Sequence, residues 1–154
     1  MRIFITGGLG FIGSNFIHEL IKDENNSILN YDSMSYAANP KNLSNLENLD
    51  NYIFVKGDIC DKDFFYDTLL DFKPDVLVNF AAESHVDRSI ESPMTFVNTN
   101  IVGTANLLQG ALNFYLNYNS DFQFIHVSTD EVFGELGKTG KFNDETSYNP
   151  KSPY

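Results

Sequence analysis

The sequence predicts an α/β protein with one parallel sheet that is covered by helices on both faces. Short apolar segments alternate along the chain with stretches in which apolar residues recur every three or four positions. Such alternation is typical of strands followed by helices, and right-handed crossovers make the strands parallel. A glycine-rich turn joins the first strand to the first helix. The chain of 154 residues, 42% of them hydrophobic, is enough for one domain with its own core.

The first strand and helix open the chain. Residues 3–5 are apolar, and after the glycine turn the apolar side chains recur at spacings of three and four. This spacing predicts one buried face of an amphipathic helix. The face comprises Phe11, Ile12, Phe16, Ile17, Leu20 and Ile21.

Two further strand–helix units follow. Residues 27–31 predict the second strand, and residues 52–55 predict the third. Between them, a spacing of three indicates a short helix, which carries Leu43, Leu46 and Leu49. The helix after the third strand is expected to end near Pro74, because proline cannot continue a helix. Its apolar positions are Phe64, Phe65, Leu69 and Leu70.

The second half predicts two strands, one long helix and a loop. Residues 76–80 are almost continuously apolar, as in a strand that is covered on both faces. A long helix is expected after Pro93, since proline suits a first turn. Residues 122–127 predict the fifth strand, and residues 134–154 predict a loop. No helix follows the fifth strand, so we expect bare apolar surface beside the last strands unless another segment covers it. The long helix carries Phe96, Val97, Ile101, Leu107, Leu108, Leu112 and Leu116.

The charge balance narrows the possible ligands. Ten Lys and Arg residues against 21 Asp and Glu residues give a formal net charge of −11. We therefore expect no nucleic-acid partner, since nucleic-acid phosphates need a basic surface. Because Arg2 and Arg88 are the only arginines, an anionic ligand must be held mainly by backbone N–H groups and helix N-termini.

Membrane spans, disulfides and metal clusters are not expected. No apolar run approaches the roughly 18–20 residues of a membrane span, and no targeting segment is present, so we expect a cytoplasmic protein. The single cysteine, Cys60, cannot form an internal disulfide or a multi-cysteine zinc site. We expect it to be a buried or half-buried structural thiol, and we expect no bound metal.

The glycine-rich turn indicates a dinucleotide site. Its sequence, TGGLGFIG at residues 6–13, places Gly7, Gly10 and Gly13 in a GxxGxxG spacing. Such glycines allow a tight turn, let a pyrophosphate approach the backbone and bring the helix close to the strand. The helix N-terminus then offers N–H groups and the positive end of its dipole to phosphates. A turn without a ligand is the alternative, but the position between a strand and a helix favours the site.

Two acids end the next two strands. Asp32 lies about 20 residues after Gly13, the separation expected of an acid that binds the adenosine ribose hydroxyls. A carboxylate there repels a 2′-phosphate, so the sequence favours NAD over NADP. Asp58 and Ile59 end the third strand, where a side chain and a backbone N–H can meet adenine. A strand-terminal turn aspartate is the alternative for Asp58.

Polar residues also follow the fourth and fifth strands. Ser128, Thr129, Asp130 and Glu131 come directly after the fifth strand, at the edge where ligands of open α/β sheets bind. Two adjacent carboxylates suit proton donation and removal at neighbouring atoms, although a helix cap with exposed acids is an equal alternative. His85 follows the fourth strand, and such a lone histidine is more often structural. Asn100 lies within the long helix, where an asparagine usually faces solvent or bonds locally.

Together these segments resemble the extended short-chain dehydrogenase/reductase superfamily, and within it the dTDP-glucose 4,6-dehydratases. The first motif, GGLGFIGSNF, is shared by the superfamily, whereas AAESHVDRSI together with STDEVFG is far more specific to the dehydratases. The resemblance also rests on NYDSMSYAANP, GDICD, TNIVGT and the terminal SPY, and it runs over the whole chain. It implies a Rossmann-type, doubly wound parallel sheet of about five strands in the order 3-2-1-4-5, incomplete at its carboxyl end. Residues 1–154 would then be a truncated NAD-binding domain whose carboxyl-terminal substrate domain is absent.

The resemblance implies roles for individual residues. Ser84, His85 and Thr129 would lie near the sugar of a bound sugar nucleotide. Tyr154 matches the tyrosine of the YxxxK motif and would take the proton of the 4-hydroxyl, while Glu131 would remove the proton from carbon 5 and Asp130 would protonate the leaving 6-hydroxyl. The residues implied to hold NAD are Gly7, Gly10, Phe11, Ile12, Gly13, Asp32, Ser33, Met34, Ser35, Asp58, Ile59, Phe80, Ala81, Ala82, Ser84 and Thr99.

The implied reaction is the NAD-dependent dehydration of dTDP-glucose to dTDP-4-keto-6-deoxyglucose. A UDP-glucose 4,6-dehydratase or a sugar-nucleotide epimerase is the nearest alternative, but the epimerases lack the Asp130–Glu131 pair. GDP-mannose dehydratases resemble NADP binders, which fits Asp32 poorly.

The length of the chain adds a further expectation. Family members are about twice as long, and their YxxxK lysine follows the tyrosine. We therefore expect the chain alone to be inactive, and a non-catalytic NAD-binding remnant or interaction module is the remaining alternative. A family-type homodimer would use the long helix and the helix that carries YxxxK, and only the former lies in this chain.

Overall fold

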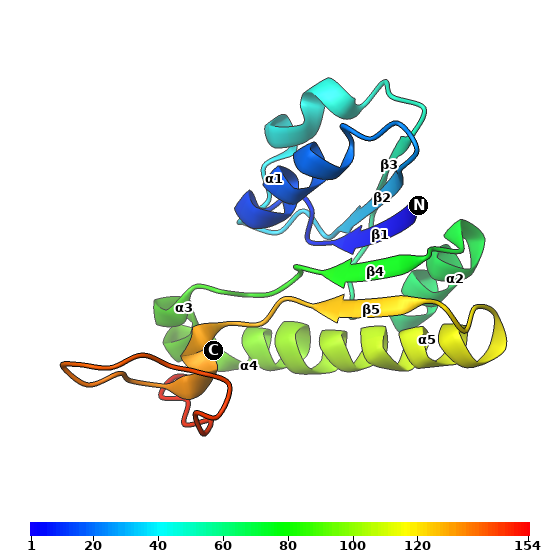
Figure 1. Cartoon of the computed structure of the whole chain (residues 1–154). Coiled ribbons are helices and arrows are strands. Elements are labelled where there is room, and N and C mark those ends of the chain that lie inside the picture. Colours follow the sequence, from blue (N-terminus) through cyan, green and yellow to red (C-terminus); the bar gives the residue numbers. More distant parts are fainter.

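The protein is built on a five-stranded parallel sheet (Figure 1), seen in a computed structural model that describes residues 1–154. The strands lie in the order β3-β2-β1-β4-β5, and every neighbouring pair is parallel. The predicted fold class and strand order are confirmed. The strands are β1 (Arg2–Thr6), β2 (Ser27–Asp32), β3 (Tyr52–Lys56), β4 (Val76–Asn79) and β5 (Gln123–His126).

Helices cover both faces of this sheet. Alternate residues of β1 point to opposite faces, so that Ile3 and Ile5 enter one core and Phe4 enters the other. On the first face lie α1 (Phe11–Leu20) and the 3-10 helix η1 (Pro40–Leu46). On the second face lie α2 (Lys62–Phe72) and α5 (Thr104–Asn117), which pack over the ring of Phe4. The chain therefore has two apolar layers separated by the sheet, as predicted.

The chain between β4 and β5 is more irregular than the sequence predicts. The expected long helix begins at Pro93 as α4 (Pro93–Phe96), but continues as the π-helix η2 (Val97–Gly103) before α5. A short helix that was not predicted, α3 (Val86–Glu91), precedes it. Single π turns inside longer helices frequently occur at functional sites.

Three apolar side chains do not lie where their spacing predicts. Phe11 and Ile12 were expected on the buried face of α1, but they are 81% and 62% exposed. Both belong to the first turn, which projects past the carboxyl edge of the sheet, so no strand lies beneath them. Leu49 was expected in the short helix with Leu43 and Leu46, but η1 ends at Leu46 and Leu49 is exposed.

The last part of the chain contains little regular structure. After β5 comes the short 3-10 helix η3 (Asp130–Phe133), and residues 134–154 form neither helix nor strand, as predicted. Ile125 in β5 and Val127 just after it remain exposed, so the expected bare apolar surface is confirmed. None of the helices combines the length and the apolar character that crossing a bilayer requires.

Candidate functional site

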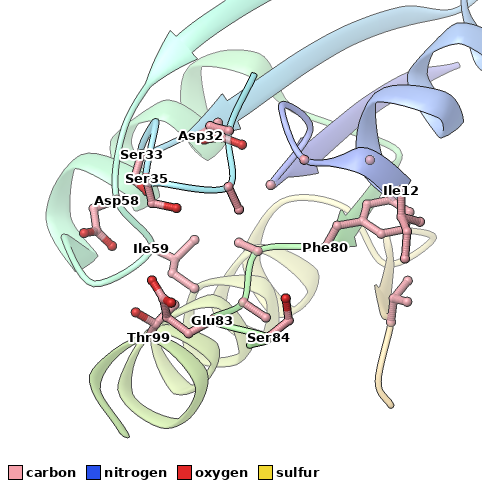
Figure 2. Close-up of a pocket in the computed structure, with 18 of the residues that line it drawn as sticks. Ile12, Asp32, Ser33, Ser35, Asp58, Ile59, Phe80, Glu83, Ser84 and Thr99 are labelled. Carbon is pink, nitrogen blue, oxygen red and sulfur yellow. The ribbon is translucent and has the colours of Figure 1, made fainter. Parts of the chain in front are cut away.

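A cavity of about 560 Å³ opens at the carboxyl edge of the sheet (Figure 2). It lies where β1 leads to α1 on one face and β4 leads to α3 on the other (Figure 1). In open α/β sheets this switch point is where ligands bind, because the two connections leave a crevice between them. The lining residues are Gly7, Gly10, Phe11, Ile12, Gly13, Tyr31, Asp32, Ser33, Ser35, Ala37, Ala38, Gly57, Asp58, Ile59, Phe80, Ala81, Ala82, Glu83, Ser84, Thr95, Thr99, Val127, Ser128 and Tyr154.

Two glycines of the turn are required by the protein itself. Gly7 has a φ of 73°, and a Cβ there would lie 2.5 Å from the backbone nitrogen of Ala81. A Cβ at Gly13 would lie 2.4 Å from the carbonyl oxygen of Gly7. Gly7 therefore lets β1 approach the chain that follows β4, and Gly13 lets α1 pack against the turn.

Gly10 has a different role. Its φ of −70° is open to any residue, and a Cβ there would meet no protein atom closer than the oxygen of Gly7 at 3.3 Å. Its missing side chain leaves free space in the cavity wall, directly before α1. The first hydrogen bond of α1 runs from the Ser14 N–H to the Gly10 carbonyl, so the N–H groups of the first turn precede the helical ladder. The residues that carry these groups line the cavity, and free N–H groups at a helix N-terminus suit an anion.

Asp32 lies on the next wall of the cavity, at the end of β2. It is buried, and its carboxylate accepts hydrogen bonds from the Leu9 N–H at 3.0 Å and the Met34 N–H at 2.8 Å. An ionised carboxylate offers about four acceptor positions. Two positions therefore remain for hydroxyl groups of a ligand, while the two backbone bonds hold the carboxylate in place.

Tyr31 and Asp58 form the far end of the cavity. The Tyr31 hydroxyl donates to the Asp58 carbonyl oxygen at 3.1 Å. Burial, together with the charges of Asp61 and Asp58, raises the pKa of Tyr31, so the hydroxyl keeps its proton and remains a donor. Gly57 permits this arrangement, because a Cβ there would lie 2.2 Å from the Tyr31 ring.

A row of polar side chains fixes the ends of three neighbouring strands. The Thr6 hydroxyl donates to the Asn79 side-chain oxygen, which also accepts from the Ala81 N–H at 3.1 Å. The Asn79 amide pairs with His126 Nδ1 at 3.0 Å. Thr6, Asn79 and His126 are aligned in register on β1, β4 and β5. These hydrogen bonds hold the end of β4 in place and so position Ala81 and Ala82 on the cavity floor.

Asn100 holds the next part of the floor. Its side chain accepts from the Glu83 N–H and donates to the Glu83 carbonyl oxygen, both at 2.8 Å. The expectation that Asn100 faces solvent or bonds locally is wrong, because the π-helix turns it toward the loop after β4. Glu83 is 8% exposed, its Oε2 atom has no hydrogen-bond partner, and it lies beside Thr99 in the cavity (Figure 2).

The cavity carries an unusual balance of charge for a phosphate site. Asp32, Asp58 and Glu83 line it, and no Lys, Arg or His does. An anionic ligand in this cavity therefore depends on backbone N–H groups and the end of α1, as the sequence predicts.

Most of the residues that the sequence assigns to NAD line this single cavity. Met34 does not; its φ of 59° turns its N–H toward Asp32. Of the residues assigned to the sugar chemistry, Ser84 and Tyr154 line the cavity. The residues assigned to sugar or catalysis that lie outside its lining are His85, Thr129, Asp130 and Glu131.

The acid pair occupies the first turn of η3. Thr129 caps this helix, with its hydroxyl accepting from the Glu131 N–H at 3.2 Å. Asp130 and Glu131 are exposed. The structure contains the cap that one alternative from the sequence described, and Ser128, one residue before it, connects the acid pair to the cavity.

Several lining residues were not predicted. Tyr31 and Val127 lie at or just beyond strand ends, and the rule that ligands bind there is a signal that could have found them. Ser128, which the sequence placed in the polar segment after the fifth strand, lines the cavity as well. Glu83 gave no signal, because an acid between Ala82 and Ser84 reads as a surface residue. The remaining unpredicted positions are Ala37, Ala38, Gly57 and Thr95.

Cys60 is a half-buried structural thiol, as predicted. Its Sγ donates to the carbonyl oxygen of Asn98 at 3.3 Å and so ties the segment between β3 and α2 to the π-helix. Burial, with a contribution from Asp58, raises the pKa of the Cys60 thiol to about 11. The thiol is therefore protonated near neutral pH, which disfavours a role as a nucleophile.

The fold and the cavity define an α/β protein of the doubly wound class with a cavity at the switch point of its sheet. A family model described as GDP-mannose 4,6 dehydratase matches residues 4–154. The chain belongs to this family.

Similar proteins carry dehydratase names. A dTDP-glucose 4,6-dehydratase of Xanthomonas campestris pv. campestris (strain B100) is 47% identical over 154 residues, which cover 97% of this chain and 44% of that protein. The dTDP-glucose 4,6-dehydratase 1 of Escherichia coli (strain K12) is 40% identical, with 100% of this chain and 46% of that protein covered. The chain thus spans less than half the length of the curated relatives it matches.

Solved structures agree with these relatives. The dTDP-glucose 4,6-dehydratase of Bacillus anthracis in complex with NAD superposes with a TM-score of 0.87 at 39% identity, covering 100% of this chain and 46% of that one. The dTDP-glucose 4,6-dehydratase of Streptomyces venezuelae with NAD bound gives 0.90 at 38% identity, covering 100% and 47%. A UDP-glucose 4-epimerase of Thermotoga maritima gives 0.85 at 28% identity, covering 100% and 46%.

Proposed function

We propose that residues 1–154 form the NAD-binding domain of a dTDP-glucose 4,6-dehydratase. The observation that carries the proposal is the cavity at the switch point between β1 and β4, with a backbone wall at Gly10 and a buried carboxylate at Asp32. Relatives whose names give this activity support the proposal, and they are up to 47% identical to the chain in sequence.

The residues present fit NAD. The free space at Gly10 admits a pyrophosphate, which the first-turn N–H groups of α1 would hold. The two open acceptor positions of Asp32 suit the adenosine ribose, and Asp58 with Ile59 would flank adenine. The opposite end of the cavity, beyond β4 and β5, remains for the nicotinamide, where Ser84 and Tyr154 line the wall. NAD would supply the hydride acceptor and donor that the reaction needs.

The chain's own groups would supply the proton transfers. Tyr154 lies on the cavity wall and would accept the proton of the sugar 4-hydroxyl. Glu131 would remove the proton from carbon 5, and Asp130 would protonate the hydroxyl that leaves carbon 6. Thr129, which holds the Glu131 backbone through its cap, would orient the pair and contact the sugar. His85 would lie near the same sugar.

NAD titration of the 154-residue chain, followed by calorimetry, tests the cofactor. We expect saturable NAD binding and at least tenfold weaker NADP binding, since a 2′-phosphate would face the buried Asp32 carboxylate. Asp32→Ser should reduce the difference in affinity between NAD and NADP. Equal affinity for NAD and NADP, or no binding to a folded sample, would contradict the proposal.

Activity measurements test the reaction. Formation of the 4-keto-6-deoxy product from dTDP-glucose is followed in the chain, supplied with NAD, and in a longer chain that carries a relative's remaining segment. We expect product in the longer chain and its loss in Glu131→Gln, with Glu135→Gln as a control just beyond the same helix. A longer chain that interconverts sugars at carbon 4 without losing water would favour the epimerase alternative.

A further inference from the structure

Two exposed side chains from opposite rims of the cavity contact each other. The Arg88 guanidinium lies over the Tyr36 ring, with its central carbon 3.7 Å from the ring centroid. Tyr36 belongs to the loop after β2, and Arg88 belongs to α3, which follows β4. These segments leave the sheet on the two sides of the switch point, so the contact bridges the crevice.

The position of the pair places it above the cavity rather than in its wall. Ser35 and Ala37, the neighbours of Tyr36, line the cavity, and so does Ser84 on the approach to α3. Neither Tyr36 nor Arg88 lines it, and both are exposed. The stacked pair therefore lies at the rim and closes one side of the opening.

The loop that carries Tyr36 is held to the rest of the protein at its ends, and one internal hydrogen bond, from the Ala38 N–H to the Ser35 carbonyl oxygen at 3.0 Å, closes a turn around Tyr36. At its start the Met34 N–H donates to Asp32, and at its end the Asn39 N–H donates to the Leu9 carbonyl oxygen at 3.0 Å. Arg88 forms no ion pair with a carboxylate, although the chain carries 21 acids. A guanidinium left without a carboxylate and stacked on a ring instead indicates that this contact sets its position.

We propose that Tyr36 and Arg88 form a clasp at the rim of the dinucleotide cavity, and that the closed clasp slows release of the dinucleotide. The inference rests on the proposed function, because it concerns the same cavity. A retained cofactor suits a reaction that restores its cofactor in every cycle. An exposed stacking contact of this kind changes an opening equilibrium by about two- to fivefold.

The release rate of the dinucleotide tests the clasp. The chain is loaded with NADH, mixed rapidly with excess NAD, and followed by NADH fluorescence. We expect Tyr36→Ala and Arg88→Ala each to speed release about two- to fivefold, with no change in melting temperature, since both side chains are exposed. Tyr36→Phe keeps the ring and should retain slow release. The double variant should release no faster than the faster single variant, because both remove the same contact.

Different failures have different meanings. If the unaltered chain does not bind NADH, the proposed function fails and the clasp fails with it. If NADH binds but Tyr36→Ala releases it at the unaltered rate, the clasp alone is refuted. Equal acceleration by Tyr36→Phe and Tyr36→Ala would also refute it, since the hydroxyl and not the stacked ring would then be responsible.

Discussion

Substituting Gly10 and Gly13 one at a time should separate the contribution of this turn to NAD affinity from its contribution to folding stability. Both glycines belong to the same turn, but a Cβ at Gly13 would lie 2.4 Å from the Gly7 oxygen and 2.8 Å from the Gly8 Cα. These are backbone atoms and cannot move aside without shifting the turn. A Cβ at Gly10 meets only the Gly7 oxygen, at 3.3 Å, and otherwise enters the cavity.

The expected magnitudes follow from these contacts. Gly13→Ala should lower the free energy of unfolding by about 1–3 kcal/mol, the usual cost of overpacking. For a chain of this size, that corresponds to a fall in melting temperature of roughly 2–12 °C. Gly10→Ala should change the free energy of unfolding by less than about 0.5 kcal/mol, because its φ of −70° suits alanine.

NAD affinity should fall more in Gly10→Ala than in Gly13→Ala, the reverse of the order expected for stability. A methyl group at Gly10 would keep the pyrophosphate from the first-turn N–H groups of α1. Loss of one hydrogen bond to a charged group costs about 1.5–3 kcal/mol, which raises the dissociation constant for NAD by roughly 10- to 150-fold. Calorimetric titration with NAD and thermal unfolding by circular dichroism measure the two quantities on the same samples.

Two results would contradict this role of Gly10. If Gly10→Ala binds NAD as tightly as the unaltered chain, the pyrophosphate does not lie against this wall. If Gly10→Ala melts as early as Gly13→Ala, the free space at Gly10 is needed for folding, and its use by a ligand loses its support.

Three further predictions concern the floor, the charge and the thiol. Asn100→Ala should lower the free energy of unfolding by about 1–3 kcal/mol and weaken NAD binding, because the Glu83 N–H and carbonyl lose their partners, whereas Asn117→Ala should do neither. NAD affinity should rise or stay constant between about 10 and 150 mM salt, since screening reduces repulsion from the −11 chain, and a fall would reveal a basic contact to the phosphates. Alkylation of Cys60 should be slow at pH 8 and accelerate toward pH 11, because its raised pKa of about 11 leaves little thiolate at lower pH; rapid reaction of the folded chain at pH 8 would contradict this.

The strands and helices were predictable because, within each element, the apolar residues recur with a single spacing, that of a strand or that of a helix. Alternation in β1 sends Ile3 and Ile5 to one core and Phe4 to the other, and the glycine turn follows at once. Periodicity failed where a side chain lies beyond the sheet. Phe11 and Ile12 continue the apolar spacing of α1, but no strand lies below the first turn, so they face the cavity instead.

The floor of the cavity was less predictable because long-range contacts shape it. Asn100 lies in a sequence that reads as plain helix, yet it bonds to Glu83, 17 residues earlier. The π-helix that turns it there is tied, through Asn98 and Cys60, to the segment between β3 and α2. Local propensity contains none of this information, because each partner lies in a different element of the fold.

The proposed sugar chemistry depends on the loop after β5 rather than on the sheet. The Asn149 N–H donates to the Val132 carbonyl oxygen at 3.0 Å, so the segment before Tyr154 is tied to η3, which carries the acid pair. Gly134, with a φ of 82°, permits this approach, since a Cβ there would collide with the Asn149 oxygen. The tyrosine on the cavity wall and the exposed Asp130 are thereby connected through one loop. A dehydration needs proton transfers at adjacent carbons of a single sugar, and a shared loop is the element that can set their spacing. Strand periodicity reports on the sheet alone, so it predicts the dinucleotide cavity but not the geometry of this loop.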